Sequence, residues 1–138
     1  MTTLTGRCSC GATTYSVSGD IFGGVLCYCK SCQRTSGGGP NYALLVANHD
    51  FSLAGEARVY EHAGGSGAIT QKHFCGKCGA HCLASAGANA HIVRIKVASL
   101  DDPSGFRPMA QVWTSNAEPW HQLIPDLPSF PENPPGAG

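Results

Sequence analysis

Eight cysteines among 138 residues constrain this chain more than any other feature of its sequence. Seven of them fall into three tight groups: Cys8-x-Cys10, Cys27-x-Cys29-x-x-Cys32 and Cys75-x-x-Cys78. The eighth, Cys82, stands apart. Disulfides, metal sites and small buried side chains are three competing explanations. Thiolates two or three residues apart can bind one ion from a single turn, whereas a disulfide needs a Cβ geometry that such neighbours rarely reach. The grouping therefore favours metal ligation.

The composition predicts a cytoplasmic chain. Nine Lys+Arg balance nine Asp+Glu, for a formal net charge of zero, and 13% of the residues are charged. This balance excludes the basic surface of a general nucleic-acid binder. No apolar run approaches the roughly 18 residues that cross a bilayer, and the first residues show no secretory signal pattern. We expect no nucleic-acid or membrane partner, and a reducing compartment that disfavours disulfides.

Zinc is the expected metal, because sets of three or four thiolates suit it and it adds no redox chemistry. An iron–sulfur cluster also takes four cysteines, so residue type alone leaves that alternative open.

The hydrophobic pattern predicts a mainly β fold. In residues 91–97, apolar side chains alternate with Arg94 and Lys96, as in a half-buried antiparallel strand. Further strands are predicted at residues 11–19, 42–47, 56–61, 68–74 and 110–114. No segment keeps the 3.6-residue period over ten or more positions, so helix should be confined to short turns.

The first and last cysteine groups are predicted to form one site. Cys8 and Cys10 begin the first predicted strand, and Cys75 and Cys78 follow the strand that ends at Phe74. Pairing of those two strands would complete a closed site of four thiolates, which is typical of structural zinc. Glycines around the second pair should let backbone amides point at its sulfur atoms.

The middle group lies on one loop: Cys27, Cys29 and Cys32. Three protein ligands with an open position are typical of catalytic zinc. Alternatively Cys82 or one of the six histidines completes the site, or Cys82 is only a small buried side chain. An ion bound by three thiolates is better suited to binding a fourth sulfur than to acidifying water, which predicts thiol chemistry. Lys30 and Arg34 flank the loop and would either offset its negative charge or stay solvated.

These motifs resemble the glutathione-dependent formaldehyde-activating (Gfa-type) enzymes, whose domain is shared with centromere protein V. The segments that carry the resemblance are Gly6-Arg-Cys-Ser-Cys-Gly11, Cys27-Tyr-Cys-Lys-Ser-Cys-Gln-Arg-Thr-Ser-Gly37, Phe74-Cys-Gly-Lys-Cys-Gly79, Ser99-Leu-Asp-Asp-Pro103 and Ser115-Asn-Ala-Glu-Pro-Trp120. The resemblance implies a β-tent of curved antiparallel sheets and two zinc ions per chain. It assigns a structural zinc to the set of four cysteines and a catalytic zinc to the set of three.

The chain departs from the family pattern at two positions. Tyr28 stands where many members have His, and Gln33 stands where many have Arg. Neither residue is an expected ligand, but both are expected where a substrate would pass.

The resemblance implies a carbon–sulfur lyase of the S-hydroxymethylglutathione synthase kind. It would add a thiol, glutathione above all, to a small aldehyde such as formaldehyde, and would catalyse the reverse. The alternative is a non-enzymatic zinc-stapled binding or scaffold module with both sites structural. Residues 1–124 would form the zinc-binding domain, and residues 125–138, with five prolines, a C-terminal tail. The oligomeric state is left open, with a homodimer as one option.

Overall fold

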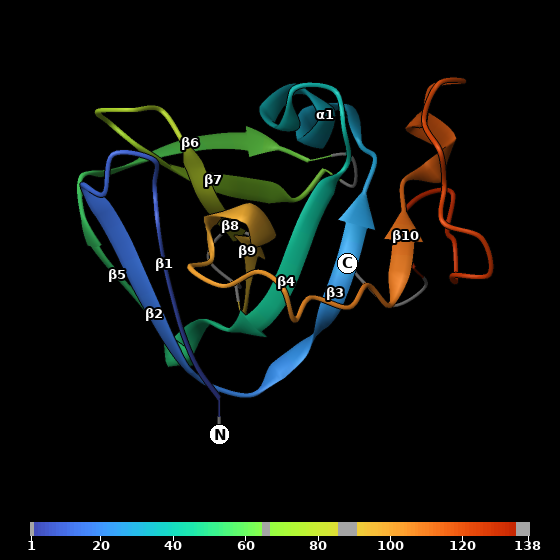
Figure 1. Ribbon diagram of the computed structural model, residues 1–138. Helices are drawn as coiled ribbons and strands as arrows, with labels where there is room; N and C mark the ends of the chain where they lie inside the picture. Colours follow the sequence, from blue (N-terminus) through green and yellow to red (C-terminus); the bar gives the residue numbers. More distant parts are fainter. Residues whose placement is uncertain (1, 65–66, 86–90, 135–138) are drawn as a thin grey trace.

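The computed structural model describes residues 2–64, 67–85 and 91–134, which form two β-sheets and one short helix (Figure 1). The three-stranded sheet has the order β1–β2–β5, from β1 (Thr2–Arg7), β2 (Thr13–Gly19) and β5 (Phe51–Gly55). The seven-stranded sheet has the order β10–β3–β4–β9–β8–β7–β6, from β3 (Ile21–Cys27), β4 (Asn41–Ala47), β6 (Ala57–Ala63), β7 (Ile69–Cys75), β8 (His81–Ser85), β9 (Ile92–Lys96) and β10 (Ala110–Val112). Helix α1 (Lys30–Ser36) connects β3 to β4. Within the described ranges, no helix has the length and apolar character that crossing a membrane requires.

The prediction of a mainly β chain with little helix is confirmed. Strand β9 shows its basis, because Val93 and Ile95 are buried while Arg94 and Lys96 are less so, and the strand pairs antiparallel with β4 and β8. The pairing is not antiparallel throughout. Strand β10 pairs parallel with β3, so the larger sheet is mixed.

The apolar core connects the two sheets. Tyr15 and Val17 of β2 pack in one cluster with buried residues of the larger sheet, including Val46, Val93 and Ile95. In Figure 1 the three-stranded sheet and strands β3 and β4 diverge from a common edge. The cluster contains buried side chains from both sheets. The hydrophobic effect on these side chains therefore holds the two sheets at a fixed separation.

The two strands expected to pair directly do not do so. Strand β2 belongs to the smaller sheet and β7 to the larger one. Their connection runs through the consecutive strands β5 and β6: Gly55 at the end of β5 opposes Thr13 of β2, and Ala57 at the start of β6 opposes Cys75 of β7. One continuous segment therefore positions both cysteine turns, at the point where it passes from one sheet to the other.

Glu56 is the residue at this crossing. Its amide N–H donates to the carbonyl oxygen of Ala12 at 3.0 Å, and its carbonyl oxygen accepts from the amide of Gly76 at 2.9 Å. Ala12 and Gly76 each lie within two residues of an expected metal ligand, so two backbone hydrogen bonds hold the turns side by side.

The described part of the C-terminal tail packs on β10 through Gln111, whose side chain is fully buried. Its backbone N–H donates to Pro128 O and its carbonyl accepts from Phe130 N, both at 2.9 Å. Its side-chain Nε2 donates to Ile124 O and Ser129 Oγ, and its Oε1 accepts from Ile124 N at 2.8 Å. Gln111 therefore makes most of the hydrogen bonds that hold residues 124–130 to the sheet, and Thr114 adds two more to the carbonyl oxygen of Phe130.

Gln111→Leu is expected to lower the free energy of unfolding by about 2–3 kcal/mol, because it removes three hydrogen bonds and leaves their partners poorly satisfied. Urea denaturation followed by circular dichroism measures this loss. Gln122→Leu, at an exposed position, serves as the control and should change stability by less than about 0.5 kcal/mol. Equal stability of the two variants would contradict the anchoring role of Gln111.

Candidate metal centres

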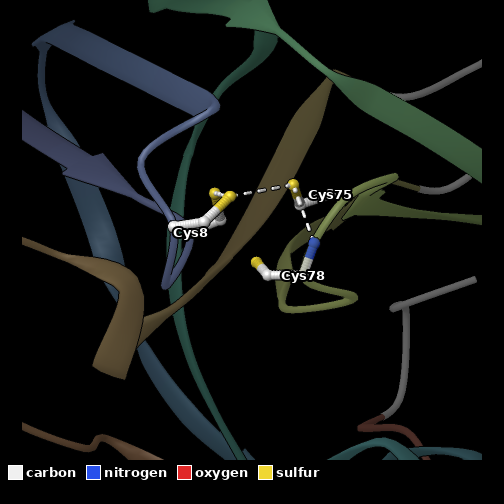
Figure 2. Close-up of side chains that lie close together, drawn as sticks. Cys8, Cys75 and Cys78 are labelled. Atoms are coloured by element: carbon white, nitrogen blue, oxygen red, sulfur yellow. Dashed lines mark hydrogen bonds between the residues drawn. The ribbon is translucent and has the colours of Figure 1, made fainter.

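The first candidate centre lies between two turns of the chain. Cys8 and Cys10 lie in the turn between β1 and β2, while Cys75 ends β7 and Cys78 lies in the turn to β8. The four Sγ atoms lie within 4.8 Å of one another. Cys10 Sγ is 3.7 Å from Cys8 Sγ and 3.7 Å from Cys75 Sγ. Figure 2 shows Cys8 facing Cys75 and Cys78 across the gap between the turns.

Backbone amides point at these sulfur atoms, as expected from the glycines around the second pair. Cys75 Sγ accepts from the N–H of Lys77 at 3.3 Å and from that of Cys78 at 3.5 Å. Cys8 Sγ accepts from the N–H of Thr13 at 3.2 Å. Hydrogen bonds from the amide of Cys78, the side chain of Thr13 and the amide of Lys77 lower the pKa of Cys75 to about 6, although burial opposes this. The turn is therefore built to hold a thiolate, the form that binds metal.

The spacing of these sulfur atoms fits a tetrahedral zinc ion. Zinc–sulfur bonds of about 2.3 Å place two ligand sulfur atoms about 3.8 Å apart, whereas a disulfide would bring them to about 2.05 Å. The observed separations of 3.7 Å match the first geometry. All eight cysteines are free thiols. This centre could therefore hold a metal ion through four sulfur atoms.

The second candidate centre is formed at the start of α1, where Cys27 ends β3, Cys29 caps the helix and Cys32 lies in its first turn. Their three Sγ atoms lie within 4.8 Å of one another. In the described part of the chain, no further cysteine, histidine or carboxylate joins this group. The arrangement could hold a metal ion through three sulfur atoms.

The three thiols share their protons unequally. Hydrogen bonds from the thiols of Cys27 and Cys32 lower the pKa of Cys29 to about 2, although burial opposes this, and the Lys72 ammonium adds to the lowering. The pKa of Cys27 is raised, because it donates to the other two sulfur atoms and is buried. The hydrogen bonds within the cluster therefore converge on the sulfur atom of Cys29.

Two lysines that the sequence motifs do not indicate, Lys72 and Lys96, hold their ammonium groups beside this centre. Lys72 of β7 donates from Nζ to Ser31 O at 3.3 Å and to Ser31 Oγ, and its residue is only 9% exposed. Lys96 of β9 donates to Asn41 Oδ1 at 2.9 Å and to Thr35 Oγ1 at 3.3 Å. The only sequence signal was the alternation that turns Lys96 away from the apolar face of its strand.

The flanking cation Lys30, by contrast, points to the surface. Its Nζ lies 2.5 Å from Glu118 Oε1, and its side chain is 49% exposed. Arg34 is also exposed. For Lys30 the solvated alternative therefore holds.

Tyr28 and Gln33, expected along a substrate path, lie in the interior instead. Tyr28 is 2% exposed, and its ring meets that of His121 edge to face at 5.1 Å. Gln33 is 8% exposed and donates from Nε2 to Tyr28 O at 2.6 Å and to Asn116 O at 2.9 Å. Both residues therefore anchor α1 to the segment after β10 and do not line an open surface.

The remaining cysteine, Cys82, belongs to neither group of sulfur atoms. It is fully buried in the core, and burial raises its pKa to about 11, with the nearby thiols of Cys8, Cys75 and Cys78 adding to the rise. A neutral thiol of this kind packs as a small apolar side chain.

Together, the fold and these centres define a mainly β protein with two thiol clusters suited to binding metal. The sequence pattern of the family described as glutathione-dependent formaldehyde-activating enzyme matches residues 3–116. The chain belongs to this family.

Two known proteins are similar to it. A protein of Halomonas elongata, provisionally named a glutathione-dependent formaldehyde-activating enzyme, is 32% identical over 81 residues. That match covers 54% of this chain and 51% of the relative, so it spans about half the relative's length. A crystal structure of a Rhodobacter sphaeroides protein, solved as a structural genomics target, has a TM-score of 0.57 at 22% identity. It covers 75% of this chain and 91% of its own, which shows a shared fold.

Proposed function

We propose that this chain is a zinc-dependent carbon–sulfur lyase that adds glutathione, or a similar thiol, to formaldehyde or another small aldehyde. The observation that carries the proposal is a cluster of three thiols joined, among the described residues, by no fourth protein ligand. Family membership supports the choice of glutathione and formaldehyde. Free thiols throughout support a reducing, cytoplasmic setting.

We assign the two centres different roles. Cys8, Cys10, Cys75 and Cys78 would hold a structural zinc, because four sulfur ligands leave no position for a substrate. Cys27, Cys29 and Cys32 would hold the catalytic zinc, with one position open. Bound there, zinc would supply Lewis acidity that lowers the pKa of an incoming thiol.

The reaction is an addition without oxidation or reduction. The thiol S–H bond breaks, a carbon–sulfur bond forms to the aldehyde carbon, and the carbonyl π bond gives way to a hydroxyl that takes up one proton. The chain contributes the positions of the ligands: the sulfur atoms of Cys27 at the end of β3, Cys29 at the cap of α1 and Cys32 within α1 lie together. Gln33 fixes α1 through two backbone carbonyls. Such positioning lowers the entropic part of the barrier.

Exchange spectroscopy by NMR on a mixture of formaldehyde and glutathione tests this function. We expect the zinc-loaded chain to accelerate exchange between free glutathione and its hydroxymethyl adduct, and Cys27→Ser to return the rate to the uncatalysed value. Cys82→Ala is the matched control, since Cys82 is in neither cluster, and it should retain most of the acceleration.

Elemental analysis should find two zinc ions per chain, and one in Cys27→Ser. Cobalt absorption spectra should show one four-sulfur site and one three-sulfur site that responds to added thiol. Two four-sulfur sites, or no acceleration by the unmodified chain, would favour the scaffold alternative and end the enzymatic proposal.

A further inference from the structure

One face of the larger sheet carries a row of cations beneath α1. Lys96 and Arg94 alternate along β9 with the core residue Ile95, so they face away from the core. Lys72 of β7 and Arg94 both oppose Ala84 of β8, so Lys72 lies on the same face. Helix α1 lies at this face, as the hydrogen bonds of Lys72 to Ser31 show (Figure 1).

Both lysine ammonium groups are bonded to residues adjacent to the three-cysteine centre. Lys72 donates to Ser31, which lies between Cys29 and Cys32 in the chain. Lys96 donates to Asn41, which directly opposes Cys27 in the pairing of β3 with β4. The two ammonium groups therefore approach the cluster from two different strands.

Two successive hydrogen bonds also connect Lys96 to the backbone of Cys32 in the helix. Thr35 Oγ1 accepts from Lys96 Nζ at 3.3 Å and donates to the carbonyl oxygen of Cys32 at 3.1 Å. The ammonium is thus fixed by hydrogen bonds to the helix that carries one ligand and to the strand beside another.

These buried cations need a counter-charge. Their acceptors are hydroxyl, amide and carbonyl oxygens, and across the described ranges no carboxylate pairs with either lysine. Burying an unpaired charge costs several kcal/mol. Cysteines that bind a metal do so as thiolates and can supply the missing charge. The acceptors of the two ammonium groups adjoin these cysteines: Ser31 and Thr35 lie in the helix that carries Cys32, and Asn41 opposes Cys27.

The charges at the centre then balance only with an anion added. A divalent ion with three thiolates has one net negative charge, and the two ammonium groups bonded beside the cluster change this to one net positive charge. Arg94 is not counted, because among the described residues no hydrogen bond or ion pair joins it to α1 or to the cluster. An anionic thiolate at the open position brings the total to zero, whereas a neutral ligand leaves the positive charge buried and uncompensated.

We propose that Lys72 and Lys96 are the counter-charge of the three-cysteine centre and select an anionic thiolate over a neutral ligand there. This inference rests on the proposed function, because it assumes an open position that receives a thiol. It names the substrate class as thiols that bind with loss of their proton to solvent. The lysines are positioning residues, since they act through the field at the site.

Ligand binding to the cobalt-loaded chain tests the proposal. The chain is titrated at fixed pH with 2-mercaptoethanol, which binds as a thiolate, and separately with imidazole, which binds neutral. The cobalt absorption spectrum measures the binding of each ligand. Lys72→Gln and Lys96→Gln each keep a hydrogen-bond donor but remove the charge. Each should weaken 2-mercaptoethanol binding roughly tenfold and change imidazole binding less than about twofold.

Matched variants separate charge from structure. Lys72→Arg and Lys96→Arg keep the charge and should bind 2-mercaptoethanol within about threefold of the unmodified chain. Lys30→Met removes a lysine next to Cys29 that pairs with Glu118 at the surface, and it should change neither affinity more than about twofold. The lysines lie on separate strands, so either Gln variant suffices if the other does not fold.

The outcomes are distinguishable. Unchanged thiol affinity in a folded Gln variant, or an equal loss for thiol and imidazole, would overturn the counter-charge role while leaving the proposed function standing. If the unmodified cobalt-loaded chain binds no thiol, the proposed function fails first, and the role of the lysines fails with it.

Discussion

Cys75→Ser is expected to unfold the chain at room temperature, the largest effect that we predict for a single substitution. Metal binding at a structural site of four thiolates contributes on the order of 10 kcal/mol to folding, and domains of this size have a net stability of about 5–15 kcal/mol. Cys75 is fully buried and lies at the centre of the contacts between the two turns. Circular dichroism and elemental analysis of the purified variant measure fold and metal together.

The control for this prediction is a substitution in the three-cysteine centre. Cys29→Ser alters a half-buried residue at the start of α1, outside the core cluster. We expect this variant to keep the β spectrum and to lose one of two zinc ions. A strong chelator should reproduce the Cys75→Ser result in the unmodified chain. Full thermal stability of the chelated, metal-free chain would contradict a structural role for the four-cysteine centre.

The cysteines of the site could be predicted from the sequence, whereas the two lysines could not. Ligands two or three residues apart are brought together by a single turn, so their grouping is visible in the chain itself. Lys72 and Lys96 lie 41 and 61 residues from the partners they bond in α1, Ser31 and Thr35. Only the pairing order of β7, β8 and β9 places them under α1, and no local pattern encodes that order.

Strands, too, could be predicted only where the local sequence pattern is enough to define them. Strand β9 could be predicted because Val93 and Ile95 alternate with Arg94 and Lys96. Strand β3 was missed, because Gly23 and Gly24 interrupt its apolar pattern. The structure explains Gly24: a Cβ there would lie 2.4 Å from Phe106 Cε1, so the ring occupies the place of a side chain. The reason for this glycine is a contact with a residue far along the chain.

Helix α1 was missed for a different reason. It has seven residues, and Gln33 is its only buried one. No apolar stripe marks it, and helices this short are not stable alone. Its stability comes from the hydrogen bonds of Gln33, from the lysine contacts and from Gly37, whose left-handed φ of 74° ends the helix.

Gly55→Ala is expected to lower the free energy of unfolding by about 4 kcal/mol, from strain and overpacking together. Gly55 has a φ of +91°, which L residues rarely adopt, and a Cβ there would lie 1.9 Å from the carbonyl oxygen of Ala12. That carbonyl also accepts the hydrogen bond of Glu56 at the crossing between the sheets. The methyl group must therefore push the Cys8–Cys10 turn away from the strand that positions Cys75.

This geometry couples a backbone substitution to metal binding. We expect Gly55→Ala to retain less zinc than the unmodified chain under mild chelation, although no ligand is altered. Gly39→Ala is the matched control, since a Cβ there meets no atom within 4 Å, and it should change neither stability nor zinc content. Thermal denaturation and elemental analysis after dialysis measure both. If Gly55→Ala lost stability but kept its full zinc content, the prediction would be wrong. Residues 55–57 would then stabilise the two sheets without positioning the four cysteines.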